Sequence, residues 1–425
     1  MKKYFRVSAL TAFLFGISSS SFASGFQLWE QTAYGTGDYH AGAAAEGDDA
    51  SLEFYNAAQI TRLKHQEISV GGVIIPVSVN YQGTVTALGT GTVSTPPGGV
   101  NSSTTSFVPN IHYVAPMLND RLFFSFGVTT PFGLETNYPS TYTDSVSLAA
   151  TETKLMTINL NPALAFKISP HFSLGAGLDS MYGSAIYNNY INAATIDEFT
   201  NNLSGWGWGF NLGALISFDP GTRVGVSYRS AISINSKGKS NWKGGPNTTH
   251  MQANLALPST TIVSLFHDFS SKWSAMASAF YTTWNSFSNL TLENIAFSIP
   301  AFNDTLIVSE NYRNTWNFAA GVHYNVLKNL TLKLGGGYDQ TPTVSGYRDI
   351  RLPDVNRYAL AMGMHWQALT SLGLELGYTH LFAPKVNVDN TNSTHATPSG
   401  ELIPEQVGTA KVAANVVGAQ LSWAF

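Results

Sequence analysis

The chain lacks cysteine, has few charged residues and, after its first two dozen positions, has no long apolar run. With no cysteine in 425 residues, disulfides and thiolate metal sites are excluded. Charged residues make up 11% of the chain, against about 25% in a soluble domain. No later apolar stretch approaches the roughly 18 residues of a transmembrane helix. If such a chain enters a membrane, it must form a closed β-barrel, because only closure pairs every backbone group in lipid.

The first residues predict a secretory signal peptide over residues 1–23. Lys2, Lys3 and Arg6 precede an apolar core at residues 7–17, and small residues stand at the expected cleavage site after Ala23. The apolar core is too short to span a bilayer. Cleavage changes the formal net charge from −4 to −7, which argues against nucleic acid as a partner.

The last residues have the ending of an outer-membrane strand. Leu421, Trp423 and Phe425 share one strand face, while Gln420 and Ser422 share the other. One such face meets lipid and the other a lumen. A terminal aromatic in this alternation is typical of bacterial outer-membrane barrels, whose assembly machinery reads it. On this ending alone, an ordinary amphipathic strand is an open alternative.

Connections alternate between short and long, as expected for periplasmic turns and outer loops. Short turns are predicted at residues 117–120, 169–171, 219–222, 270–272, 327–329 and 370–371. Longer polar stretches lie near residues 83–103, 132–151, 191–204, 237–250, 287–310, 343–355 and 390–410. Seven outer loops mean seven hairpins, so we predict an all-β membrane protein with a 14-stranded antiparallel transmembrane β-barrel over residues 66–425.

Period-2 alternation assigns the faces of these strands. Leu122, Phe124 and Phe126 alternate with small residues, which predicts an apolar lipid face and a small or polar lumen face. Trp206 and Trp208 fit an aromatic girdle at one membrane interface. The alternative is a large soluble β-sandwich with inward aromatics.

Residues 24–65 differ from the rest of the chain because they lack alternation. Glycine and alanine crowd residues 41–45, and residues 48–51 contain aspartate and serine that can cap a short helix. Small side chains permit close backbone approach, so we expect this segment to form a hatch, a plug with short helices inside the lumen. A periplasmic tail is the alternative.

The chain resembles FadL-type long-chain fatty acid transporters over essentially its whole mature length. The resemblance rests on the segments 24–28, 30–31, 35–37, 41–42, 48–51, 54–58, 131–134, 161–165, 352–354 and 357–360. It implies a hatch-filled 14-stranded barrel in the outer membrane of a Gram-negative bacterium. It also implies that a hydrophobic ligand is captured at the outer loops and moves to a lumen pocket. The ligand then leaves sideways, where the third strand kinks.

Two groups of residues are implied in this lateral gate. The hatch ends in an Asn-Pro-Ala motif in the family, whereas here Asn56 and Ala58 flank Ala57 in place of the proline. The hatch end at Asn56 is expected to lie against the third strand, residues 121–133. Proline and glycine weaken ladder pairing and favour a bend in this strand. Its gate candidates are Gly127, Pro131, Phe132 and Gly133.

A fatty acid also needs a partner for its carboxylate. Strand parity turns four basic residues inward as candidate ligand-binding residues, with Arg313 and Arg357 preferred over Arg229 and Lys333. Asp179 and Glu375 also face inward. Lumen ion pairs with these acids or with the hatch are therefore the alternative for each basic residue.

Other functions stay open from the sequence. The same fold serves an aromatic hydrocarbon channel equally well, and a general porin is disfavoured by the hatch. An enzyme is not expected, because the chain has no Gly-x-Ser-x-Gly motif and His267 and Asp268 point to opposite strand faces. We expect no cofactor and no metal. The expected partners are a long-chain fatty acid or other hydrophobic molecule, outer-membrane lipids and the barrel assembly machinery, with the chain acting as a monomer.

Overall fold

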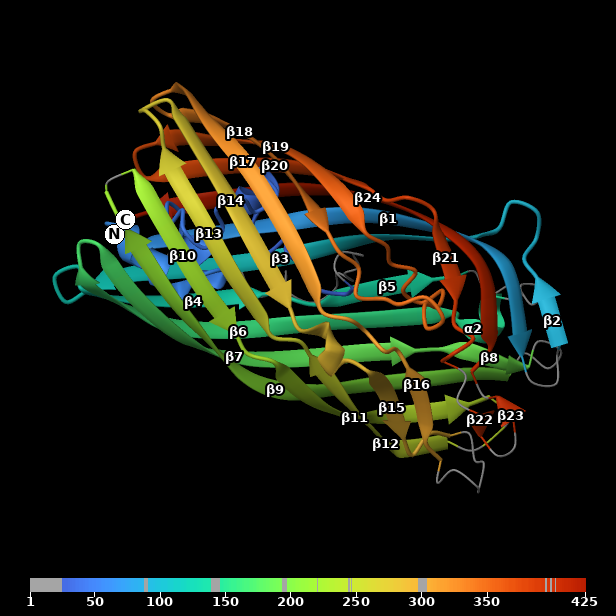
Figure 1. Ribbon diagram of the computed structural model, residues 1–425. Helices are drawn as coiled ribbons and strands as arrows, with labels where there is room; N and C mark the ends of the chain where they lie inside the picture. The colour runs from blue at the N-terminus through green and yellow to red at the C-terminus, as the bar shows by residue number, and fades with distance from the viewer. Residues whose placement is uncertain are drawn as a thin grey trace, which may run out of the picture.

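The structure is a computed structural model that shows a closed antiparallel barrel (Figure 1). It describes residues 25–87, 91–138, 146–192, 197–219, 221–243, 245, 247–296, 304–393, 396–397, 400–401 and 403–425. The predicted signal peptide lies outside these residues and stays a prediction. The first strand, β1, pairs with the last, β24, which closes the ring of strands.

The barrel has 14 strands, which confirms the predicted fold class. Eight run without interruption: β1 (Glu67–Ala87), β3 (Val100–Met117), β6 (Glu152–Ser169), β7 (Phe172–Tyr187), β9 (Asp197–Ser217), β18 (Leu330–Asp339), β19 (Arg357–Leu369) and β24 (Glu405–Ala424). Six are built from two pieces: β4 (Leu122–Thr129) with β5 (Gly133–Asn137), β10 (Thr222–Arg229) with β11 (Ile232–Trp242), β12 (Asn247–Leu257) with β13 (Thr260–Asp268), β14 (Trp273–Thr282) with β15 (Asn289–Glu293), β16 (Leu306–Ser309) with β17 (Thr315–Leu327), and β20 (Leu372–Phe382) with β21 (Val386–Asp389).

The short turns stand where they were predicted, but several outer loops are shorter than expected. Strand β1 continues to Ala87, and β9 begins at Asp197 rather than after residue 204. The small pieces β2 (Gly91–Ser94), β8 (Asn189–Asn192), β22 (Ala396–Thr397) and β23 (Gly400–Glu401) lie among the outer connections. These stretches are rich in polar residues, which is why the sequence predicted loops there. They are strands because the ladders of β1 with β24 and of β9 with β11 continue through them.

The faces of a long strand exchange character along its length, as β24 shows. Near the periplasmic end Gln420 and Ser422 point inward and are buried, as predicted. Toward the outer end, Val412 and Val416 point inward and Lys411 points outward. The prediction of a small or polar lumen face is therefore wrong for the outer half of this strand. A side chain there meets water outside and a packed core inside, so the apolar residues turn inward.

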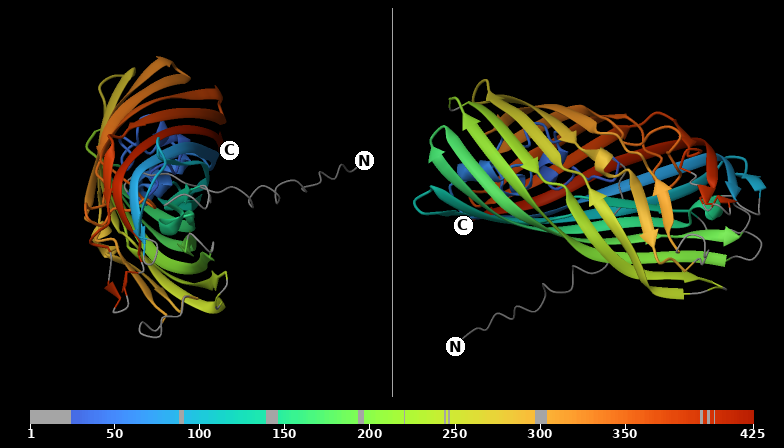
Figure 2. Two further views of the ribbon diagram at one scale, coloured as in Figure 1. Left: turned by 90° about the vertical axis from the view of Figure 1, so that its right-hand side faces the viewer. Right: turned by 60° about the horizontal axis from the view of Figure 1, so that its bottom comes forward.

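The segment before β1 lies inside the barrel and is almost wholly buried (Figures 1 and 2). It carries α1 (Ala33–Thr36), η1 (Ala50–Phe54) and η2 (Ala57–Arg62). Each begins at a residue whose side-chain oxygen accepts a backbone N–H two positions on: Thr32, Asp49 and Asn56. We call residues 25–66 the inner segment. Elsewhere lie α2 (Val146–Ala149) and η3 (Trp284–Ser286), and no helix of the described chain is long and apolar enough to cross a membrane.

Candidate functional site

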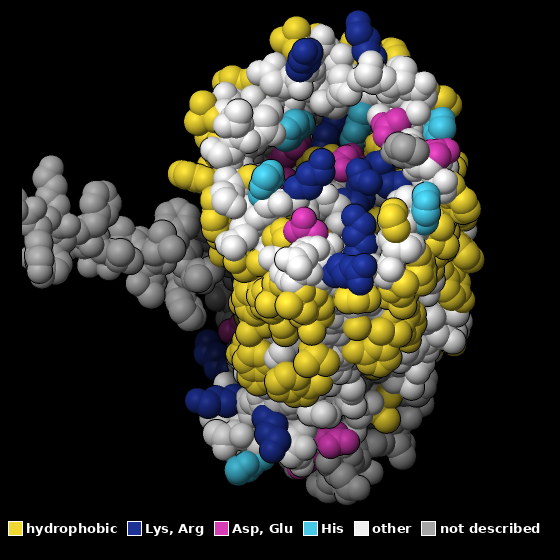
Figure 3. Space-filling view, turned by 90° about the vertical axis from the view of Figure 1, so that its left-hand side faces the viewer, with side chains coloured by type: hydrophobic (Ala, Val, Ile, Leu, Met, Phe, Trp, Pro, Cys, Tyr) yellow, Lys and Arg dark blue, Asp and Glu magenta, His cyan; other side chains and the backbone are white. Residues whose placement is uncertain are grey.

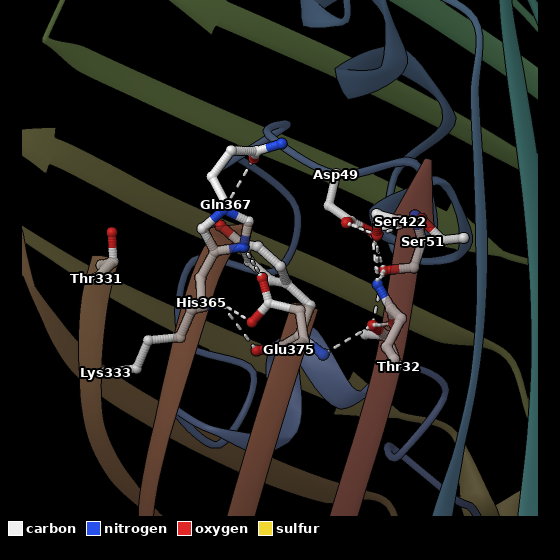
Figure 4. Close-up of polar contacts among 12 residues, drawn as sticks. Thr32, Asp49, Ser51, Thr331, Lys333, His365, Gln367, Glu375 and Ser422 are labelled. Carbon is white, nitrogen blue, oxygen red and sulfur yellow. Dashed lines mark hydrogen bonds and ion pairs between the residues drawn. The ribbon is translucent and has the colours of Figure 1, made fainter. Parts of the chain in front are cut away.

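A buried carboxylate fastens the inner segment to the wall beside β24. Asp49 Oδ1 accepts hydrogen bonds from Ser51 N at 2.8 Å, Gln420 Nε2 at 2.9 Å and Ser69 Oγ at 3.2 Å. Its second oxygen accepts from Ser422 Oγ at 2.5 Å. Figure 4 shows Asp49 and Ser51 of the inner segment facing Ser422 on β24. Charge-assisted bonds to a buried carboxylate are among the stronger ones, so this is a firm point of attachment.

A second attachment involves Lys333, one of the predicted ligand-binding residues. Its Nζ lies 3.3 Å from Glu375 Oε2 and donates to the Tyr34 carbonyl at 3.2 Å. The same glutamate also contacts His365 Nδ1 (Figure 4). Lys333 is buried, and it joins the wall to the inner segment. At Lys333 the structure therefore contains a lumen ion pair, which was the alternative to ligand binding in the sequence analysis.

Arg357 and Arg229 are also engaged by acids of the wall. Arg357 donates from Nη2 at 2.5 Å and from Nε at 3.1 Å to Asp339 Oδ2. Arg229 contacts Asp179 Oδ1 and donates to the Phe54 carbonyl at 2.7 Å. Both arginines therefore hold structure together, and a ligand must share or displace these contacts.

Arg313 differs from the other three basic candidates. It lies between β16 and β17, outside any strand, so the parity argument for it was wrong. Its Nε donates to the Thr341 carbonyl at 3.1 Å. Among the described residues it has no carboxylate within ion-pair distance, and its side chain is exposed. It is therefore the basic candidate whose charge is least committed.

A small cavity of about 20 Å³ lies between the inner segment and the wall. Trp29, Phe54 and Tyr55 line it, together with Ile262 of β13. Arg229 is at its edge, with the guanidinium carbon 4.4 Å from the centroid of the Phe54 ring. Aromatic walls with one convergent charge are the usual lining of a ligand pocket. The cavity has room for about one water molecule, so a larger ligand requires the lining side chains to move.

The third strand is interrupted where proline and glycine stand. Ladder pairing of β3 with this strand ends at Ile111–Val128. Residues 100–110 of β3 continue to pair with β1 on their other side. In the described chain they have no ladder partner on the third strand, whose second piece begins at Gly133. The wall therefore lacks backbone ladder pairing between these two strands over this stretch.

The inner segment holds the interruption by hydrogen bonds. Gln31 Nε2 donates to the Thr130 carbonyl and Gln31 Oε1 accepts from Thr130 N, both at 2.8 Å. Leu28 N donates to the Pro131 carbonyl at 2.8 Å. Sequence reasoning missed Gln31, because a single glutamine carries no signal of the strand it will meet.

Phe132 turns into an aromatic cluster. Its ring lies 6.1 Å from that of Phe26 and 6.2 Å from that of Trp284. Phe287 and Tyr312 complete the cluster, at 5.3 and 6.4 Å from Phe26. The inward turn of the third strand is thus packed as well as hydrogen-bonded.

Asn56 lies elsewhere than predicted. Its Nδ2 donates to the Ala214 carbonyl of β9 at 3.0 Å and to the Ala44 carbonyl at 2.7 Å. Asn56 itself therefore lies against β9 and not the third strand, whereas η2, which it caps, packs mainly on β6, β7 and β9 and also contacts β4 of the third strand. Ala57 and Ala58 are buried there, and a Cβ on Gly175 of β7 would meet both.

Gly127 makes room for a buried contact between Glu53 and His112. A Cβ at this position would lie 2.0 Å from Glu53 Oε1, and the same oxygen lies 3.0 Å from His112 Nδ1. We expect Gly127→Ala to lower the free energy of unfolding by about 1–3 kcal/mol, the usual cost of overpacking. Gly373→Ala is the matched control, since the nearest atom to its Cβ would be His365 Cε1 at 3.1 Å, and the next two would lie at 3.7 and 3.8 Å. Equal stability of both variants in urea unfolding would contradict this.

Asp38, Glu46 and His323 form a buried group whose ligand atoms lie within 4.8 Å of one another. His323 Nε2 is 2.8 Å from Asp38 Oδ2, and its Nδ1 is 3.3 Å from Glu46 Oε1. Burial raises the pKa of Asp38 to about 7 and that of Glu46 to about 7. The residues are of types that bind metals, but a histidine between two carboxylates is complete without an ion. Sequence spacing missed the group, since its members are far apart in the chain.

Comparison with known proteins identifies the family. A family model described as "Outer membrane protein transport protein (OMPP1/FadL/TodX)" matches residues 14–425. The chain is 28% identical to outer membrane protein P1 of Haemophilus influenzae, with all of both chains covered. It is 27% identical to the long-chain fatty acid transport protein of Escherichia coli O6:H1 strain CFT073, over 91% of this chain and 93% of that protein.

Solved structures agree on the fold. A Pseudomonas aeruginosa FadL homologue superposes with a TM-score of 0.82 at 23% identity, covering 94% of this chain and all of the other. The Pseudomonas putida toluene transporter TodX gives 0.70 at 14% identity, covering 95% of this chain and all of the other. The family match spans the barrel and the inner segment alike, and it agrees with an outer-membrane location. The chain therefore belongs to the outer membrane transport proteins of the OMPP1/FadL/TodX family.

Proposed function

We propose that this protein takes up long-chain fatty acids or similar hydrophobic molecules passively across the outer membrane. The observation that carries the proposal is the apolar lumen face of the outer half of the barrel. On β1 alone, Val73, Ile75, Val77, Val79 and Tyr81 are buried and point inward. Such a lining suits an acyl chain and opposes a water-filled path for polar solutes.

The relatives support a hydrophobic ligand but differ in its chemistry. One is named a long-chain fatty acid transport protein, and a structural neighbour is a toluene transporter. Uptake of aromatic hydrocarbons is therefore the second candidate. A general porin is the third, and it predicts large single-channel conductance. We propose no catalytic role.

The proposed route begins at the outer loops, continues to the cavity beside Arg229 and leaves through the wall between β3 and the third strand. Carrying an acyl chain through water would cost about 0.8 kcal/mol per exposed CH₂. A path that opens toward lipid avoids this cost. The exit strand carries Gly127, Pro131, Phe132 and Gly133. The inner segment faces this strand, and its end is held against β9 at Asn56, Ala57 and Ala58.

We assign the head group two successive partners. Arg313, whose guanidinium has no ion pair among the described residues and bonds only the Thr341 carbonyl there, would meet the carboxylate first. Arg229 would receive it in the cavity, in exchange for part of its contact with Asp179. Arg357 and Lys333 are buried in ion pairs, so they would stabilise the folded structure and would not bind the ligand. The chain would work as a monomer, inserted by the barrel assembly machinery and surrounded by outer-membrane lipids.

The test compares an acid with its methyl ester in binding to the purified protein. We expect Arg229→Gln to weaken binding of a long-chain fatty acid roughly tenfold, because a charge-assisted hydrogen bond contributes about 1.5–3 kcal/mol. Binding of the ester should change less than about twofold. Equal losses for both ligands would show that Arg229 only supports the fold. Preference for toluene over either would instead favour the second candidate.

A further inference from the structure

The outward face of the wall changes from apolar to polar at Trp206. Along β9, Leu212 and Phe210 are exposed below it, and Ser204 follows above. The Trp206 ring lies 5.4 Å from that of Tyr182 on β7. Paired aromatic rings at such a transition mark the membrane interface, and this one faces the outer leaflet because the short turns lie at the other end.

Two lysines stand directly beyond this interface on the neighbouring strand. Lys237 pairs with Ser204, and Lys239 pairs with Asn202. Both lysines are exposed on one face of β11. A strand rises about 3.3 Å per residue, so their Cα atoms are roughly 7 Å apart. Two like charges at this spacing favour an anion between them.

The surroundings leave these charges uncompensated. In the described chain neither lysine has a carboxylate within ion-pair distance. Glu293 is separated from Lys237 by a whole strand, since Gln252 pairs with both. His250 adds a further exposed polar group on β12. Figure 3 shows the hydrophobic belt of the barrel with Lys and Arg side chains on both sides of it.

We propose that Lys237 and Lys239, with Trp206 below them, bind the phosphate groups of lipopolysaccharide in the outer leaflet. The aromatic pair would lie at the boundary of the acyl chains, while the ammonium groups contact phosphate. This site is on the outside of the wall and separate from the ligand route. It uses the outer-membrane location and does not depend on the transported substrate.

The experiment titrates the full-length protein in detergent with bisphosphorylated lipid A, read by native mass spectrometry. We expect Lys237→Gln/Lys239→Gln to bind about twentyfold more weakly, since one lysine near an anionic lipid surface contributes a factor of about five. The matched control is Lys272→Gln/Lys328→Gln, which removes two exposed lysines at the opposite rim. The control should bind as the parent does.

A second arm uses lipid A without phosphates. Its affinity for the parent protein should be as low as its affinity for the Lys237→Gln/Lys239→Gln variant. Unchanged binding by Lys237→Gln/Lys239→Gln would overturn the proposal. An equal loss in the control would overturn it too, by revealing unspecific attraction. Strong binding of the dephosphorylated lipid would assign the affinity to the apolar belt. Fatty acid binding, measured in parallel, should be the same in all variants, which separates this site from the transport function.

Discussion

Replacing Asp49 with alanine is expected to release the inner segment from the wall while the barrel stays closed. The carboxylate accepts hydrogen bonds from five buried donor groups on η1, β1 and β24. Each buried donor left without a partner costs about 1–3 kcal/mol, so we expect docking to weaken by about 3–5 kcal/mol. Hydrogen exchange would show this as lost protection over residues 25–66, with protection of β1 and β24 retained.

Asp48→Ala is the matched control, since it removes the neighbouring carboxylate. Asp48 is exposed and pairs at 3.1 Å with Arg62, and a surface pair of this kind contributes about 0–1 kcal/mol. Its exchange pattern should match that of the parent. If Asp49→Ala keeps full protection of the inner segment, the network beside β24 does not hold it.

Replacing Gln31 with alanine is expected to cut delivery of fatty acid roughly tenfold without affecting its capture. This side chain makes both hydrogen bonds that draw Thr130 inward. Without them the third strand is free to pair further with β3, which closes the proposed exit. Surface-bound and internalised labelled fatty acid, measured separately on cells, would separate the two steps.

Gln59→Ala controls for general loosening of the inner segment. Gln59 is equally buried and makes two side-chain bonds, to the carbonyls of Ala43 and Leu52, while Gln31 makes three. Neither partner is on the third strand, so delivery should stay within about twofold of the parent. Normal delivery from a folded Gln31→Ala variant would exclude this interruption as the exit.

Local sequence pattern was sufficient for the wall of the barrel. The alternation that ends at Phe425 and the turn residues between strands are properties of neighbouring residues, so they could be interpreted without the fold. The capping role of Asp49 was equally local, since the carboxylate bonds the N–H of Ser51 two residues on.

Pattern was misleading where the environment of a strand changes along its length. Val412 and Val416 show the same alternation as Leu421, but they face the lumen. Alternation fixes that two faces differ, whereas only the position of the bilayer decides which face is apolar. The outer parts of β1 and β9 were taken for loops for the same reason.

By itself the sequence determined the fold class, the strand count, the turns and the presence of a separate segment before β1. Only the tertiary structure decided which residues meet across the lumen: Asp49 with Gln420, Gln31 with Thr130, and Asn56 with β9 instead of the third strand. It also paired Arg229, Lys333 and Arg357 with acids and left Arg313 uncommitted. The physical reason is the sequence separation of the residues that interact. Strand periodicity depends on neighbouring residues, whereas contacts between the inner segment and the wall join residues up to 373 positions apart, and no local pattern encodes them.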